Sequence, residues 1–147
     1  MRDIQRTLID KEPSIVPKVA VIEDEQPIQL MYKLKLEREG FLVATASSGW
    51  EGLKVAHEFL PDLLLLDLRM PGMDGDEMLA RLRRTDWGCD MRVIVLTNIS
   101  RNEAPQALRF LNVDRYVVKA HYTPTQVVAL VYEVLGIKPA ALHGGPT

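Results

Sequence analysis

Four consecutive leucines, Leu63–Leu66, run directly into Asp67, and this stretch constrains the fold more than any other part of the chain. An unbroken apolar run of this length, closed by the turn residues Pro71 and Gly72, is typical of a strand buried on both faces of a parallel sheet. Asp67 then lies at the carboxyl end of that strand. Taken alone, an acid in this position is most often a turn or helix-capping residue.

Three other apolar runs along the chain also end in polar residues. The first run ends in the pair Glu23 and Asp24, the second in Thr97 and the third in Lys119. Because the carboxyl ends of parallel strands meet at one edge of the sheet, where ligands bind in such folds, we expect these side chains to converge with Asp67. Three acids, a hydroxyl and an ammonium form a site suited to metal-assisted phosphoryl acceptance.

The alternation of apolar strands with helix-period segments predicts one α/β domain over residues 18–137, built from βαβ units. Residues 1–17 are interpreted as an N-terminal extension and residues 138–147 as a flexible C-terminal tail. The strands are expected at about residues 18–23, 41–46, 62–67, 92–97 and 115–119.

Local signals predict where the helices begin and end. Pro27 suits a first helical turn and Gly40 a left-handed helix end. The expected buried stripe of this helix is Ile28, Met31, Leu34 and Leu36. Capping-box patterns predict three of the other helix starts, at Ser48, Ser100 and Thr123, with the helix from Ser100 continuing through Leu111.

Charge and composition exclude several classes of function. The 147-residue chain has a net charge of −2 and no basic run, which disfavours direct binding of nucleic acid. Its single cysteine, Cys89, excludes an internal disulfide. No stretch approaches the ~20 apolar residues that a membrane span needs, so we expect no membrane insertion and a cytoplasmic protein.

In their order and spacing the motifs resemble those of the CheY-like receiver (response-regulator) domain of two-component signal transduction, in its single-domain form. The resemblance covers about residues 18–137. It implies a flavodoxin-like (βα)5 doubly wound fold with a five-stranded parallel sheet in the order 2-1-3-4-5. The motifs that carry it are Val21 to Glu25, Asp67 to Gly75, Val95 to Thr97 and Tyr116 to Lys119.

The resemblance also implies a Mg²⁺ site. Glu23, Asp24 and Asp67 are expected to hold the ion together with the backbone carbonyl of Arg69 and water. A coordination shell of oxygen atoms that is partly hydrated is the one that Mg²⁺ prefers. The ion would cancel much of the repulsion among the carboxylates and the incoming phosphate.

By the same resemblance, Asp67 is the phosphoacceptor, supplied by a sensor histidine kinase or a histidine phosphotransfer protein. Lys119 and Thr97 are expected to contact phosphoryl oxygens, and Tyr116 to swing inward as a switch. The output face would be the segment near residues 100–111 with the last strand and the last helix, contacting a downstream protein target or a second copy in a homodimer. Such a protein is not an enzyme beyond self-catalysed phosphoryl acceptance and autodephosphorylation.

Four positions depart from the common receiver pattern. Glu23 replaces an Asp, and Ala120 stands where Pro usually follows the Lys. A cis bond before Ala costs about 3–4 kcal/mol, so we expect either a trans bond with a rearranged loop or a strained cis bond. Arg69 and Asn98 are large polar residues beside the phosphoryl site, which leads to the hypothesis of an altered phosphoryl lifetime.

The same residues bear on several other functions. A pseudo-receiver that binds a partner without phosphorylation, and a receiver fragment of a longer regulator, remain alternatives. Haloacid-dehalogenase-type phosphatases need a second Asp two residues after the nucleophile, where this chain has Arg69. A flavodoxin-like FMN binder needs a hydroxyl- and glycine-rich phosphate loop, whereas the segment from Glu23 to Pro27 is acidic and repels phosphate.

Overall fold

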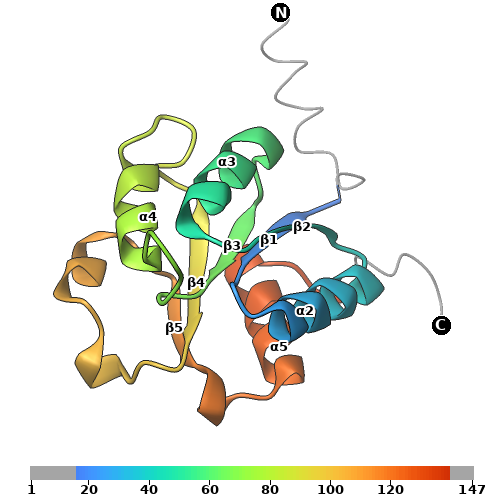
Figure 1. Ribbon diagram of the computed structural model, residues 1–147. Coiled ribbons are helices and arrows are strands. Elements are labelled where there is room, and N and C mark those ends of the chain that lie inside the picture. The colour runs from blue at the N-terminus through green and yellow to red at the C-terminus, as the bar shows by residue number, and fades with distance from the viewer. Residues whose placement is uncertain (1–15, 140–147) are drawn as a thin grey trace, which may run out of the picture.

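A five-stranded parallel sheet in the order β2-β1-β3-β4-β5 forms the centre of the molecule (Figure 1). The computed structural model describes residues 16–139, and most of the expected extension and tail lie outside them. The predicted fold and strand order are confirmed, with each strand within one residue of its predicted bounds. The strands are β1 Lys18–Ile22, β2 Leu42–Ala46, β3 Leu63–Leu66, β4 Arg92–Thr97 and β5 Arg115–Val118.

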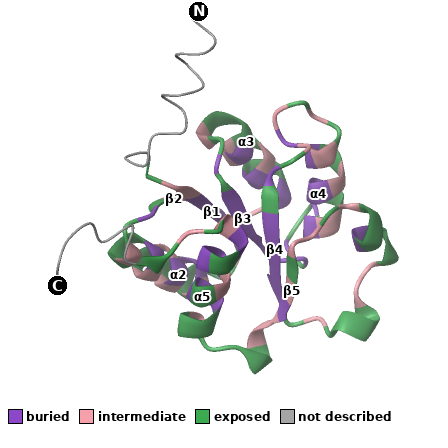
Figure 2. Cartoon of the chain, turned by 180° about the vertical axis from the view of Figure 1, so that it is seen from behind, coloured by how far each residue is buried: buried purple, intermediate pink, exposed green. Residues whose placement is uncertain are grey.

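Helices cover both faces of this sheet. Helices α2 (Gln26–Glu39) and α5 (Pro124–Leu135) lie on one face, and α3 (Gly49–Phe59) and α4 (Gly75–Arg83) on the other (Figure 1). Two hydrophobic clusters result, one per face. The central strands β1, β3 and β4 between them are mostly buried, while the outer helix surfaces are exposed (Figure 2). All four leucines of β3 are at most 1% exposed, which confirms the doubly buried strand.

The helix ends largely follow the predicted signals. Pro27 lies in the first turn of α2, and Gly40 ends that helix with a left-handed φ of 106°. The Ser48 side chain accepts a hydrogen bond from the Glu51 N–H, and Thr123 forms a complete capping box with Gln126. The predicted buried stripe of α2 is partly wrong: Leu34 is 45% exposed, whereas Gln29 and Tyr32 are buried beside Leu36.

The helix predicted from Ser100 through Leu111 is absent from the described chain. Two short 3-10 turns, η1 (Arg101–Glu103) and η2 (Gln106–Phe110), replace it, and the Ser100 side chain makes no capping hydrogen bond. Pro105 supplies the physical reason, because a proline disfavours helical geometry in the preceding residue and has no N–H to donate. Ala104 is accordingly extended, with φ −64° and ψ 146°.

One half-buried arginine, Arg83, connects the loops at the opposite end of the sheet from the strand-end acids. The guanidinium of Arg83 donates hydrogen bonds to five backbone carbonyls, those of Gly88, Cys89, Met91, Leu111 and Asn112, at 2.7–3.3 Å. Burial lowers the pKa of Arg83, although nearby acids oppose this effect. The rigid five-donor fork of arginine suits this cage of carbonyls, and lysine offers no equivalent.

We expect Arg83→Met to lower the free energy of unfolding by about 2–4 kcal/mol, because it leaves several carbonyls without donors. Arg83→Lys should recover only a minor part of the loss. Urea unfolding followed by circular dichroism measures both changes. Arg84→Met, at an exposed neighbouring position, is the matched control and should change stability by less than about 0.5 kcal/mol. Equal losses in Arg83→Met and Arg84→Met would contradict the assignment.

Candidate functional site

The polar residues predicted to converge do so at the carboxyl edge of the sheet. Glu23 follows β1, Asp67 follows β3, Thr97 ends β4, and Lys119 begins the 3-10 turn η3 (Lys119–His121) directly after β5. In the parallel register Ile22 pairs with Leu66 and Leu66 with Val95, so the residues that follow them emerge side by side. The sheet topology alone therefore brings together residues nearly one hundred positions apart.

Three carboxylates form the centre of this site. Glu23, Asp24 and Asp67 each offer an oxygen, and these oxygens lie within 4.8 Å of one another. Glu23 is 3% exposed and Asp67 is 6% exposed, while Asp24 is half-buried. Asp67 Oδ1 accepts a hydrogen bond of 3.4 Å from the backbone N–H of Arg69. Clustered carboxylate oxygens of this kind match the donor set that Mg²⁺ prefers.

Lys119 compensates this negative charge, but it contacts one acid more closely than the other. Its Nζ lies 2.6 Å from Glu23 Oε1 and 3.3 Å from Asp67 Oδ2. The second oxygen of Glu23 accepts a hydrogen bond from the Glu25 N–H at 3.2 Å. The longer side chain of Glu23, compared with the usual Asp, makes the short contact with Lys119.

Burial and charge shift the ionisation of this pair. Burial, together with the nearby Asp67 charge, raises the pKa of Glu23 to about 7, although the hydrogen bond from Lys119 opposes the shift. Burial lowers the pKa of Lys119, but the hydrogen bond with Glu23 and the charge of Asp67 outweigh it, so the pKa is raised. In the absence of a cation, Glu23 is therefore protonated more readily than an exposed glutamate.

Thr97 and Tyr116 are linked through the loop that follows β4. Thr97 is buried, and its Oγ1 accepts a hydrogen bond of 3.4 Å from the Ile99 N–H. The half-buried Tyr116 donates its hydroxyl hydrogen bond to the Ile99 carbonyl at 2.7 Å. The tyrosine hydroxyl is thus directed to the β4 loop and not to the acid cluster.

The bond between Lys119 and Ala120 is trans, as is every peptide bond in the described part of the chain. Of the two bond geometries expected here, the trans bond is the one found. The chain turns directly into η3, and Lys119 still reaches the acid cluster.

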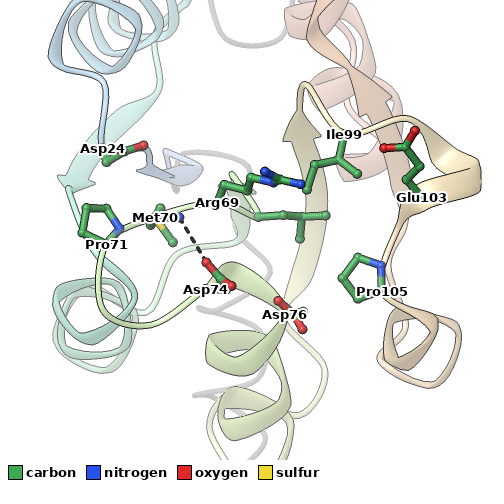
Figure 3. Close-up of a pocket in the computed structure, with 10 residues that line it drawn as sticks. Asp24, Arg69, Met70, Pro71, Asp74, Asp76, Ile99, Glu103 and Pro105 are labelled. Carbon is green, nitrogen blue, oxygen red and sulfur yellow. Dashed lines mark hydrogen bonds between the residues drawn. The ribbon is translucent and has the colours of Figure 1, made fainter.

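Two adjoining cavities open onto this edge of the sheet. One of about 460 Å³ is lined by Asp67, Thr97 and Asn98. The other, of about 600 Å³, extends past Pro71 and Asp76 (Figure 3). Arg69 lines both cavities, and its side chain points across the opening toward Ile99 and Glu103 (Figure 3). Arg69 and Asn98 therefore border the entrance to Asp67, as their sequence positions suggest.

Sequence reasoning missed a supporting residue, Gln29, which lies beneath Glu23. The buried amide of Gln29 donates to the carbonyls of Glu23 at 2.8 Å and Ala46 at 3.0 Å, which fixes the ends of β1 and β2. Tyr32 lies on the same helix face, and burial and the Glu23 charge raise its pKa to about 12. The spacing of Gln29, Tyr32 and Leu36 was the available signal, because positions i, i+3 and i+7 share one face of a helix.

Gly75 allows α4 to begin directly against the acceptor strand. Its N–H donates a hydrogen bond to the Leu68 carbonyl at 2.8 Å, and a Cβ at this position would collide with the backbone carbonyl of Asp67. Any other residue would displace either α4 or Asp67. The glycine of the Asp67-to-Gly75 motif therefore has a steric role next to the site.

Comparison with known proteins identifies the family. Residues 19–131 match the model of the response regulator receiver domain. Because the match covers most of the chain, this protein belongs to the response regulator receiver domain family. Receiver domains are signalling modules that bind Mg²⁺ at an acidic pocket, and the acid cluster described above lies in that region of the fold.

Curated relatives are transcriptional regulators of greater length. The chain is 42% identical over 106 residues to the transcriptional regulatory protein AfsQ1 of Streptomyces coelicolor, covering 71% of this chain and 45% of AfsQ1. It is 37% identical over 130 residues to the phosphate regulon regulator PhoB of Rhizobium meliloti, covering 87% and 56% of the respective chains. The chain thus spans about half the length of the curated relatives it matches.

Solved structures share the fold over almost their whole length. The chemotaxis protein CheY4 of Vibrio cholerae aligns with a TM-score of 0.75 at 25% identity, covering 82% of this chain and 99% of CheY4. The response regulator TrrA of Thermotoga maritima, solved in complex with Mg²⁺ and BeF, aligns with a TM-score of 0.71 at 29% identity, covering 81% and 99%. Within residues 16–139, none of the helices is long and apolar enough to cross a membrane.

The pKa of Glu23 leads to a prediction for the metal-free protein. Between the unfolded value of 4.5 and the folded value of about 7, the folded state binds more protons than the unfolded state. The resulting stabilisation is complete below pH 4.5 and is lost as the pH rises through 7. Compared with Glu23→Gln, the wild type should lose about 2–3 kcal/mol of unfolding free energy between pH 5 and pH 8.

Urea unfolding in EDTA at several pH values between 5 and 8 measures this difference. Glutamine keeps the side-chain length and a hydrogen bond acceptor for Lys119, so the substitution removes mainly the ionisation. Glu58→Gln, at an exposed site on α3, is the matched control. Parallel stability profiles for wild type and Glu23→Gln would show that the pKa of Glu23 is not raised.

Proposed function

We propose that this chain accepts a phosphoryl group on Asp67 from a histidine kinase or a histidine phosphotransfer protein, in a Mg²⁺-dependent reaction. The observation that supports this most strongly is the meeting of Glu23, Asp24 and Asp67 with Lys119 at one edge of the sheet. Membership of the receiver family makes such partners the expected ones.

Asp67 is the proposed nucleophile. Its backbone is held at the end of β3, and its carboxylate contacts the Arg69 N–H through Oδ1 and Lys119 through Oδ2. These contacts orient the carboxylate toward the cavity that Thr97 and Asn98 line. In the transfer an Asp67 oxygen forms a bond to phosphorus while the bond from phosphorus to the donor imidazole nitrogen breaks.

The donor atoms present fit a Mg²⁺ ion. Glu23, Asp24 and Asp67 are its proposed side-chain ligands, with the backbone carbonyl of Arg69. When bound, the ion supplies positive charge that reduces the repulsion between these acids and an incoming phosphate. Because Glu23 also contacts Lys119 at 2.6 Å, its carboxylate would be shared between the proposed metal ion and the lysine.

Lys119 and Thr97 are the proposed partners of the phosphoryl oxygens, through an ammonium and a hydroxyl. Movement of Thr97 toward the phosphoryl group would pull on the loop that also binds the Tyr116 hydroxyl, because both side chains are hydrogen-bonded to Ile99. Tyr116 is thus the proposed switch, and the face formed by η1, η2, β5 and α5 the proposed output surface. Phosphorylation would shift an existing equilibrium of two states.

The receiver can act as a single-domain protein or as one domain of a longer regulator. A single-domain, cytoplasmic regulator is the form proposed from the sequence. The length of the curated relatives favours a second candidate, in which this receiver is the regulatory part of a longer transcriptional regulator. Both forms rely on the same site and the same chemistry at Asp67.

Intact mass spectrometry after incubation with acetyl phosphate tests phosphoryl acceptance. We expect the purified chain to gain one phosphoryl group with Mg²⁺, and none with EDTA or in Asp67→Asn. Asp86→Asn, an exposed acid in the loop after α4, is the matched control and should be modified like the wild type. Failure of the wild type to gain mass would favour the pseudo-receiver interpretation.

The position of Arg69 and Asn98 at the entrance to Asp67 leads to a prediction for the lifetime of the acyl phosphate. Arg69→Ala and Asn98→Ala should each accelerate loss of the acyl phosphate severalfold, because each removes bulk that shields the entrance from water. The decay of phosphorylated protein, followed by mass after removal of the donor, measures the rate. Arg84→Ala serves as the surface control, and unchanged rates in Arg69→Ala and Asn98→Ala would refute the shielding role.

A further inference from the structure

Tyr32, on α2, is a buried polar residue that the proposed chemistry does not use. Its side chain is 5% exposed and packs in the hydrophobic cluster between the sheet and helices α2 and α5. Within residues 16–139, its hydroxyl forms no hydrogen bond with another side chain or with the backbone. A tyrosine hydroxyl usually has a hydrogen-bond partner when its ring is buried. Tyr32 therefore holds a donor that is available to a group within its reach.

The alternation of side chains along the strands places the acid cluster on the same face of the sheet as Tyr32. Glu23 lies on the face of Val21, and Asp67 lies on the face of Leu65, because side chains two residues apart in a strand share a face. Val21 and Leu65 belong to the hydrophobic cluster that contains Tyr32. Helical side chains also lean toward the start of their helix, and α2 begins at the edge of the sheet that holds the acids. The Tyr32 ring is therefore directed toward Glu23 from below.

A small cavity of about 10 Å³ lies where these residues meet. Tyr32, Glu23 and Asp67 line it, together with four apolar side chains from β1, β3 and β4. The charge of Glu23 reaches the phenol, because it adds to the effect of burial in raising the pKa of Tyr32 to about 12. The hydroxyl thus stays protonated at neutral pH, as a hydrogen-bond donor must. The cavity leaves room for small movements of these side chains toward each other.

Both carboxylate oxygens of Glu23 are engaged in the structure. Oε1 lies 2.6 Å from Lys119 Nζ, and Oε2 accepts the hydrogen bond of 3.2 Å from the Glu25 N–H. In the proposed reaction Lys119 turns to a phosphoryl oxygen, so Oε1 loses its partner while Glu23 is only 3% exposed. A buried carboxylate oxygen without a hydrogen bond is costly. Tyr32 has the free donor that this oxygen then needs.

We infer that Tyr32 is a positioning residue of the site, whose hydroxyl donates a hydrogen bond to Glu23 Oε1 when Lys119 leaves that oxygen. Carboxylates that bind a metal ion are commonly held by such hydrogen bonds, which fix their orientation. The inference rests on the proposed function, because the departure of Lys119 from Glu23 is a step of that reaction. It assigns Tyr32 a role in the reaction and none in binding the phosphodonor.

Phosphorylation of the full chain by acetyl phosphate, followed by intact mass at saturating Mg²⁺, tests the role of the hydroxyl. Tyr32→Phe keeps the ring and removes only the oxygen. We expect its maximal rate to fall about tenfold. The acetyl phosphate concentration that gives half of the maximal rate should not change, because the donor does not touch Tyr32.

Tyr132→Phe is the matched control. Tyr132 lies in the same hydrophobic cluster as Tyr32, but its hydroxyl donates a hydrogen bond of 2.8 Å to Glu39 at the other end of α2. Its removal should lower stability without slowing phosphorylation. A loss of rate in Tyr32→Phe alone therefore reports the missing hydroxyl and not a general weakening of the cluster.

Fluorine NMR of the chain labelled with 3-fluorotyrosine gives a readout that does not depend on the rate. The chain has four tyrosines, and Tyr32→Phe identifies the signal of Tyr32 by its loss. We expect this signal to shift in Lys119→Met without any phosphodonor, because Glu23 is released there too. It should shift in the same direction in the wild type during phosphorylation, while the Tyr132 signal stays constant.

The outcomes separate this inference from the proposed function. A wild type that gains no phosphoryl group refutes the proposed function and the inference with it. A wild type that is phosphorylated, while Tyr32→Phe reacts as fast as Tyr132→Phe, overturns the inference alone. A Tyr32 signal that stays unchanged in Lys119→Met and during phosphorylation of the wild type overturns it as well.

Discussion

The ion pairs of Lys119 with two buried carboxylates are the interaction on which the site depends. Lys119 follows the edge strand β5, whereas Glu23 and Asp67 follow β1 and β3 in the middle of the sheet. Buried acids are costly unless they are paired and hydrogen-bonded. The lysine therefore joins three strands at their functional ends and makes the burial of the acids tolerable, while the hydrogen bonds from Gln29 hold the ends of β1 and β2 in place.

Replacing the common Asp by Glu23 changes how this charge is shared. The longer side chain brings its carboxylate to 2.6 Å from Lys119, while Asp67 is 3.3 Å away. A cation entering the acid cluster competes with Lys119 for Glu23, since one carboxylate would serve both. Lys119 would then be freed for Asp67 or for a phosphoryl oxygen. In the proposed site, the extra methylene group of Glu23 would therefore couple metal binding to the position of Lys119.

Pro105 has a comparable effect at the proposed output surface. By ending the helical geometry at Ala104 it leaves two 3-10 turns where one helix was predicted, and a cavity of about 580 Å³ lies between these turns and β5, beside Tyr116. The departure from regular helix thus lies on the face through which receiver domains are expected to signal.

The sequence by itself determined the strands, their order through the family resemblance, and the identity of the residues at the strand ends. It could do so because a run such as Leu63–Leu66 is stable only when buried on both faces, and burial makes the register strict. It misplaced the buried face of α2, where Leu34 is exposed and Gln29 is buried, because two neighbouring faces of that helix are similarly apolar. The helix expected after Ser100 was predicted from its cap, without the stronger effect of Pro105.

Only the tertiary structure decided which acid Lys119 contacts most closely, that the Lys119–Ala120 bond is trans, and where the Tyr116 hydroxyl points. These features depend on distances between side chains from different strands, and no local pattern encodes such distances. Patterns of burial and capping act over a few neighbouring residues, so they can be recognised in the sequence. Charge sharing and loop geometry arise from packing among distant segments, so they exist only in the folded chain.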